Sequence, residues 1–171
     1  MANTDIVRGL WPIGHLCGGE IRASEYTVTT SATIYQGDIV ELDAAGTVGV
    51  AEAGDATAVV GVSNGYVSSA AAGTKIMVFD DPNKIFGLQQ ETGGTVAAAD
   101  VGLSADANTY VAGSSTTKMS AVELSSTLGT TAAQFLILGK IETADNDWGE
   151  NCKLRVIFNE HRYKGAGSAG V

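Results

Sequence analysis

The stretch Gly61–Gly65 reads GVSNG and matches G-x-S-x-G, the pattern that carries the nucleophilic serine of many hydrolases. In those enzymes a strand runs into a tight turn and then a helix, which exposes the serine hydroxyl beside oxyanion-stabilising N–H groups. Here a strand-like segment precedes Ser63, but Gly73 interrupts before an amphipathic helix can form. An esterase with Ser63 as nucleophile and His161 as base is therefore the weaker alternative, and a Ser-Asn-Gly hairpin turn the stronger interpretation.

Two other stretches have the composition of ligand sites. Residues 165–170 read GAGSAG and fit G-x-G-x-x-G, but the dinucleotide fingerprint must open a helix, and none can follow before Val171. Residues 145–150 read DNDWGE and offer alternating oxygen ligands, but the twelfth position counted from Asp145 is Val156, where a calcium loop needs Glu. We expect a flexible tail from the first stretch and a turn with Trp148 against a sheet from the second.

The remaining chemically capable side chains are isolated in the sequence. Neither His15 nor His161 has a histidine four residues away, and Cys17 and Cys152 lie in no metal-ligand spacing. We expect two free thiols, with a disulfide between them as the alternative. The chain is therefore predicted to be no enzyme and to bind neither metal nor cofactor.

Charge narrows the classes of partner. Nineteen acidic residues against ten basic ones give a net charge of −9, and the pI is about 4.5. Nucleic acids and anionic membranes are bound mainly through clustered Lys and Arg, so neither is an expected partner. No apolar run approaches the roughly twenty residues that span a bilayer, and we expect a soluble protein made in the cytoplasm.

The composition and the short apolar segments predict an all-β protein. Hydrophobic residues make up 44% of the 171 positions, and there are 22 glycines but only two prolines. Segments rich in β-branched and aromatic residues alternate with turn residues, which is typical of a small β-barrel or sandwich of the jelly-roll or tulip type. The segments are YTVTT, DIVEL, TVGVAE, TAVVGV, GYVSS, KIMVFD, IFGLQQ, FLILGKIE and KLRVIFNE. One short helix is predicted from near Thr95 to before Gly102.

We divide the chain into an extended N-terminal arm (1–22), a β-domain (23–163) and a flexible C-terminal tail (164–171). Asp80 and Asp81 are adjacent, so on a strand they would point to opposite faces and make a poor acid/base pair. With Pro82 they instead predict a turn between two strands.

Two groups of residues resemble a known family. The opening MANTDIVRGLWPIGHLCGG is followed by ATIYQGDIVELDAAGTV, VAEAGDATAVVGVSNGY, VFDDPNKIFGLQQE and AAADVGL. The order of these blocks resembles the decoration, or cement, proteins that stabilise the heads of tailed phages. In that family an R-G-L-x-P arm leads into a β-barrel, and an Asp-Asp-Pro turn precedes Phe and Gln. The matching residues here are Arg8, Gly9, Leu10, Pro12, Asp80, Asp81, Pro82, Phe86 and Gln89.

The resemblance implies a virion protein on the outer capsid surface, set as a trimer at three-fold or quasi-three-fold positions. Its partners would be the major capsid protein and two further copies of itself. Family arms carry more positive charge where this chain has Trp11 and Gly14, so docking is expected to rely on apolar burial. The predicted capsid contacts are Arg8, Leu10, Trp11, Pro12, Ile13 and His15.

The sequence leaves open alternatives for the role of the N-terminal segment and for the function. The residues LWPI could instead cover one end of their own barrel, because large apolar residues are more often core than interface. If they form an arm, deleting residues 1–14 leaves a folded domain that no longer binds shells. A tail or baseplate accessory, or a carbohydrate-binding module of the virion, is the next alternative to head decoration, and aromatic residues at 6% disfavour sugar binding.

Overall fold

The computed structural model describes residues 3–6, 8–51, 59–108 and 113–164. Within these ranges nearly all regular structure is β. The strands are β1 (Trp11–His15), β2 (Ser24–Thr27), β3 (Ile39–Leu42), β4 (Val48–Val50), β5 (Val59–Ser63), β6 (Lys75–Phe79), β7 (Lys84–Gln89), β8 (Ser104–Ala105), β9 (Phe135–Lys140) and β10 (Lys153–Phe158). One 3-10 turn, η1 (Ala98–Asp100), is the single helical element of the described residues.

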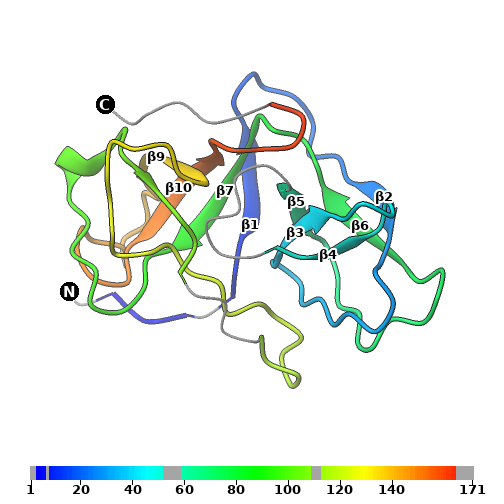
Figure 1. Cartoon of the computed structure of the whole chain (residues 1–171). Helices are drawn as coiled ribbons and strands as arrows, with labels where there is room; N and C mark the ends of the chain where they lie inside the picture. The colour runs from blue at the N-terminus through cyan, green and yellow to red at the C-terminus, as the bar shows by residue number, and fades with distance from the viewer. Residues whose placement is uncertain (1–2, 7, 52–58, 109–112, 165–171) are drawn as a thin grey trace.

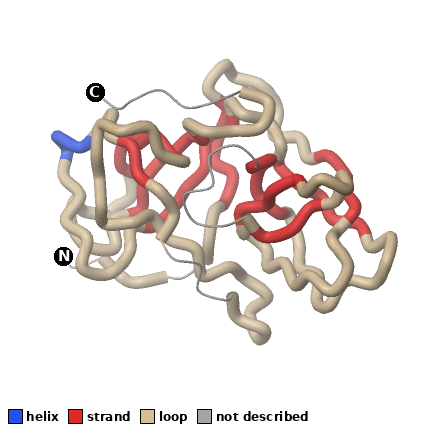
Figure 2. The backbone as a smooth tube through the Cα atoms, viewed as in Figure 1, coloured by secondary structure: helices blue, strands red, loops and turns tan. Residues whose placement is uncertain are grey.

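The strands form two antiparallel sheets, which confirms the all-β prediction. The first sheet has the order β1-β7-β10-β9-β8 and the second β2-β6-β5-β3-β4. They lie side by side, with long loops between the strands of each (Figures 1 and 2). The predicted helix is reduced to η1, which starts three residues after Thr95 and is capped by Asp100, whose carboxylate accepts the Ala97 N–H at 2.8 Å. None of the described helical structure is long and apolar enough to cross a membrane.

The second sheet closes on itself as a small barrel. Val28, just after β2, forms a parallel bridge with Val48 of β4, and Thr29 N–H donates to Val48 O at 2.9 Å. The two edges of the sheet therefore meet. The closed sheet surrounds a core of its own, formed by Val28, Ile34, Val40, Val48, Val60, Ala70, Ile76 and Val78.

A second core lies between this barrel and the first sheet. Strand residues alternate between faces, so Ile39 and Val62 leave the barrel interior and pack with Phe86 and Leu154 of the first sheet. This arrangement explains why β5 is buried along its whole length. A series of rings extends the core, with centroids 6.5 Å apart for Phe79–Phe86, 5.6 Å for Phe86–Phe158 and 4.9 Å for Phe135–Phe158.

Two segments differ from the prediction. Residues 65–69, GYVSS, form no strand, and only Val67 makes an isolated bridge, to Ile34. Residues 11–15 form β1, which pairs with β7 at the edge of the first sheet although they were expected to belong to a separate arm. Pro12 suits an edge strand because it has no N–H to donate. Residues 165–171 of the predicted tail lie outside the described part of the chain.

The N-terminal segment crosses the barrel where two glycines touch. Gly9 has a φ of +65° and Gly37 a φ of +90°. A Cβ on Gly9 would overlap Ser120, and one on Gly37 would lie 2.9 Å from the carbonyl oxygens of Arg8 and Leu10. Leu10 N–H donates to Gly37 O at 3.1 Å. The close approach of the two backbones therefore depends on both glycines.

We predict that Gly9→Ala destabilises the protein more than Gly46→Ala. Both positions have positive φ, but a Cβ at Gly46 meets nothing within 4 Å. Gly46→Ala should cost only the conformational strain of about 1 kcal/mol, and Gly9→Ala at least about 2 kcal/mol because of the added overlap with Ser120. Urea unfolding of both variants measures this difference, and equal losses would contradict the close crossing.

Candidate functional site

The first residues of the chain lie against the first sheet. The Asn3 amide donates to Asp147 O and Glu150 O at 2.8 and 2.7 Å and accepts the Asp147 N–H at 2.8 Å. Ile6 N–H donates to Gln89 Oε1, and Gln89 Nε2 donates to Asp5 Oδ1, both at 3.0 Å. Side-chain amides therefore fix residues 3–6 on the outer surface of the body.

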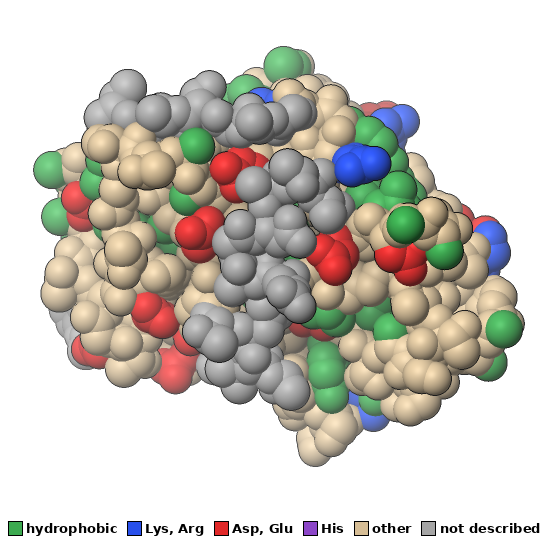
Figure 3. Space-filling view, in the orientation of Figure 1, with side chains coloured by type: hydrophobic (Ala, Val, Ile, Leu, Met, Phe, Trp, Pro, Cys, Tyr) green, Lys and Arg blue, Asp and Glu red, His purple; other side chains and the backbone are tan. Residues whose placement is uncertain are grey.

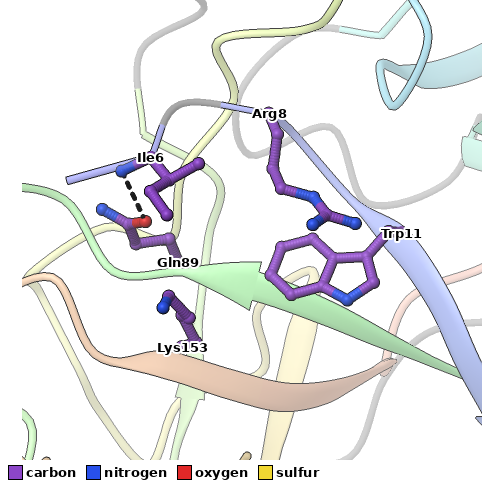
Figure 4. A pocket seen from close by; sticks show the side chains of 5 residues that line it. All are labelled: Ile6, Arg8, Trp11, Gln89 and Lys153. Carbon is purple, nitrogen blue, oxygen red and sulfur yellow. Dashed lines mark hydrogen bonds between the residues drawn. The ribbon is translucent and has the colours of Figure 1, made fainter. Parts of the chain in front are cut away.

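Arg8, Trp11 and Gly87 form a stack. The Arg8 guanidinium carbon lies 4.0 Å from the centre of the Trp11 ring system. Trp11 is paired with Gly87 across β1 and β7, and a Cβ at Gly87 would overlap the indole, so the missing side chain gives the ring its place. Beside the stack is a cavity of about 100 Å³ lined by Ile6, Arg8, Trp11, Gln89 and Lys153 (Figure 4).

The predicted contact residues fall into buried and exposed groups. Leu10 is 3% exposed and belongs to the core between the sheets, whereas Ile13 is 38% exposed. Arg8, Trp11, Pro12 and His15 are half-buried. Deleting residues 1–14 would remove the buried Leu10 and most of β1, so the structure argues against the prediction that this deletion leaves the domain folded. The alternative, in which the residues LWPI cover one end of their own barrel, fits the burial of Leu10 and the partial burial of Trp11.

His15 and the Asp81 turn are joined. His15 Nδ1 accepts the N–H groups of Cys17 and Gly19, both at 3.1 Å, which leaves the proton on Nε2 to be donated to Asp81 Oδ2 at 3.0 Å. Burial alone would raise the pKa of Asp81, but hydrogen bonds from the Asn83 N–H and from His15 hold it below its ordinary value. Lys84 N–H donates to Asp81 O at 3.1 Å, closing the turn between β6 and β7. The turn thus links the two sheets and anchors the end of β1.

Lys84 is a residue of this region that sequence reasoning missed. Its side chain is fully buried, with Nζ 3.5 Å from Arg22 O and 5.2 Å from the centre of the Phe79 ring. Burial lowers the pKa of Lys84. Nearby, the Tyr26 hydroxyl donates to Asp80 Oδ2 at 2.9 Å. Nothing in the stretch DDPNKIF distinguishes this lysine from one at the surface.

Ser63 holds two parts of the backbone together. It ends β5, is 1% exposed, and its hydroxyl donates to Tyr35 O and accepts the Asp38 N–H at 3.2 Å. Burial lowers the pKa of His161 to about 4. The His161 Nδ1 accepts the Tyr163 N–H at 3.2 Å, and its Nε2 has no hydrogen-bond partner. The Ser63 hydroxyl therefore has a structural use in the barrel and no solvent access.

The loop that resembled half a calcium site is organised by an amide. Asn146 is 1% exposed; its Nδ2 donates to Ile141 O and Lys153 O and its Oδ1 accepts the Lys153 N–H, all at 2.8 Å. Trp148 packs on the core between the sheets, as predicted. In the described residues no three His, Cys, Asp or Glu side chains gather as metal ligands. Cys17 is exposed and Cys152 buried, and both are free thiols.

Exposed apolar side chains concentrate near the N-terminus. Seven large apolar side chains of the described residues are exposed, and four of them lie between positions 6 and 21. We call these four, Ile6, Ile13, Leu16 and Ile21, together with Arg8 and Trp11, the N-terminal surface. Elsewhere the molecule shows many acidic side chains, as one face illustrates (Figure 3). These side chains are spread along the first sheet, because Ile6 N–H bonds to Gln89 at the end of β7 and Leu16 N–H bonds to Asn83 just before its start. Exposed apolar side chains spread over such a length suit a protein partner better than a small substrate.

The fold and this surface define an all-β protein with a candidate interaction site. Comparison of the chain with protein-family models and with curated proteins finds no match.

An acidic cluster lies close to the N-terminal segment. Glu123 Oε1 is buried without a hydrogen-bond partner. Burial, and then the charges of Asp5 and Glu91, raise the pKa of Glu123 from its ordinary 4.5 to about 7. Ionised Glu123 therefore opposes the folded state.

We predict that Glu123→Gln stabilises the protein above pH 7 and not below pH 4.5. The folded protein holds a proton on Glu123 between those pH values while the unfolded chain has lost it, so the wild type loses stability as the pH rises through this window. The variant lacks that loss and should gain about 1 kcal/mol at pH 8, because the carboxyl is only partly buried. Urea unfolding of both proteins at pH 4.5 and pH 8 tests this. If the difference in unfolding free energy between the variant and the wild type is the same at both pH values, the prediction is contradicted.

We also predict that Ser63→Ala destabilises the protein by about 1–3 kcal/mol, because Tyr35 O loses its hydroxyl donor. Ser68→Ala, at an exposed position, is the control and should change stability by less than about 0.5 kcal/mol. Fluorophosphonate treatment of the native wild type should leave Ser63 unlabelled. Labelling of Ser63 would instead revive the esterase alternative.

Proposed function

We propose that this protein is a head decoration protein of a tailed phage. It binds the outer surface of the expanded head and bridges neighbouring major capsid subunits. It does so as a homotrimer at three-fold or quasi-three-fold positions. The proposal starts from the family resemblance of the R-G-L-x-P segment and the Asp-Asp-Pro turn. The strand that continues this segment ends at His15, which contacts Asp81 of the turn.

The observation that carries the proposal is the concentration of exposed apolar side chains on the N-terminal surface. Ile13 is 38%, Ile6 44%, Ile21 49% and Leu16 57% exposed. Leaving apolar side chains in water is unfavourable. Burying these side chains against a second protein contributes roughly 25 cal/mol of favourable free energy for each Å² of apolar surface removed from water.

The architecture suits a protein that reinforces a shell. The barrel closes its own edges and shares a core with the first sheet. Such a body resists deformation, and it needs no catalytic group to act. A ligand that binds only the expanded lattice stabilises that lattice in proportion to the logarithm of its concentration over its dissociation constant. The acidic surface also supports an external location, since it does not compete for the packaged genome.

Co-sedimentation with heads assembled from the major capsid protein of the same genome tests the proposal. We expect saturable binding at a fixed ratio to expanded heads and none to compact ones. The double variant Ile13→Ser, Leu16→Ser should bind at least about tenfold more weakly, because it removes two apolar anchors of the N-terminal surface. Met77→Ser is the matched control, since Met77 is 41% exposed on β6 of the barrel and lies outside that surface.

Two outcomes would contradict the proposal. If the wild type binds neither form of the head, decoration is excluded and a tail, baseplate or carbohydrate-binding role takes its place. If the Met77 variant loses as much binding as the double variant, the N-terminal surface is not the contact. Circular dichroism of each variant separates lost binding from lost folding.

A further inference from the structure

Arg8 is a cation with no anionic partner among the described residues. Its guanidinium lies on Trp11, with 4.0 Å between the guanidinium carbon and the ring centre. Its Nε is buried and has no hydrogen-bond partner. Burial lowers the pKa of Arg8, and no neighbouring carboxylate offsets that effect. Arg8 is the arginine of the described residues that has a buried donor without a hydrogen-bond partner, whereas Arg22, Arg155 and Arg162 are exposed.

The other polar side chains around the adjacent cavity are partly used by neighbours. Gln89 uses its oxygen for the Ile6 N–H and one amide N–H for Asp5. Lys153 Nζ donates to Asp145 Oδ2 at 3.1 Å. Arg8 is the lining cation that contacts no carboxylate of the described residues, and Figure 4 shows its guanidinium above Trp11.

The size and lining of the cavity select the ligand. Its volume of about 100 Å³ equals roughly three water molecules at about 30 Å³ each. That space holds a carboxylate with one or two methylene groups. Ile6 and Trp11 provide apolar surface for the methylenes, and a guanidinium placed over an indole can still offer N–H groups to a carboxylate.

We propose that this cavity receives the carboxylate of an Asp or Glu side chain from a different protein, with Arg8 as its ion-pair partner. The source is a different protein and not a second copy of this chain, and the oligomeric state of the Arg8 variant separates the two. The inference rests on the proposed function only for the identity of the partner, which would be the capsid subunit. The recognition chemistry is independent of it.

The carboxylate contact is tested by NMR without any shell. The Arg8 Nε–H and Trp11 indole N–H signals of the wild type are followed while acetyl-glutamate amide is added at low salt, with acetyl-glutamine amide as the neutral probe. We expect a saturable shift of both signals in the millimolar range with the glutamate probe alone. Arg8→Gln should abolish the shift of the Trp11 signal. Arg162→Gln, at an exposed position whose N–H donates to Val59 O and which does not line the cavity, should keep it.

Three results would overturn the proposal. The first is an equal response to the glutamine probe, and the second an unchanged Trp11 response in the Arg8 variant. The third is tighter binding of inorganic phosphate than of the glutamate probe, which would make the cavity a general anion site.

The source of the carboxylate is tested separately. Sedimentation velocity of wild type and Arg8→Gln should show the same oligomeric state, and self-association lost in the variant would overturn the assignment to a different protein. In head binding, Arg8→Glu should weaken binding at least tenfold while Arg162→Glu does not. A positive NMR titration with no binding of the wild type to heads would refute the proposed function and leave the carboxylate site standing. Binding of the wild type to heads without a response in the NMR titration would support the proposed function and refute the carboxylate site.

Discussion

The contact on which the two halves of the molecule depend is the crossing of backbones at Gly37. Leu10 N–H donates to Gly37 O, and Gly37 N–H donates to Ser63 O, both at 3.1 Å. Three segments far apart in the sequence are thus joined in one row of backbone hydrogen bonds. This row connects the segment that precedes β1 to the barrel. Because the spacing leaves no room for side chains at Gly9 and Gly37, the row holds only with glycine at both positions.

The sequence predicted the strands that carry their own hydrophobic signal. KIMVFD and KLRVIFNE contain β6 and β10, because runs of β-branched and aromatic residues favour a buried pleated surface. β1 was missed because Pro12 and Gly14 lower the strand propensity of WPIGH, and its stability comes from pairing with β7. Because the paired residues lie about seventy positions apart, no local sequence pattern indicates this pairing.

The candidate site was predictable in its position and not in its geometry. The segment from Arg8 to Pro12 was singled out, but its residues have separate tasks: Leu10 fills the core, and Arg8 lies on Trp11 outside it. The role of Gly87 follows only from the register that places it opposite Trp11. Ser63 shows the reverse error, since a sequence pattern suggested chemistry where the hydroxyl fastens the barrel.

An N-terminal strand that is already ordered changes the energetics of binding a partner. A free arm would lose roughly 1–2 kcal/mol of backbone conformational entropy for each residue fixed on a shell. Here β1 is fixed by β7, and residues 3–6 are held by Asn3 and Gln89 before any partner arrives. The exposed side chains Ile13 and Leu16 can then be buried with little further loss of backbone freedom. The same contacts that hold the N-terminal segment on the first sheet therefore prepare its outer face for binding.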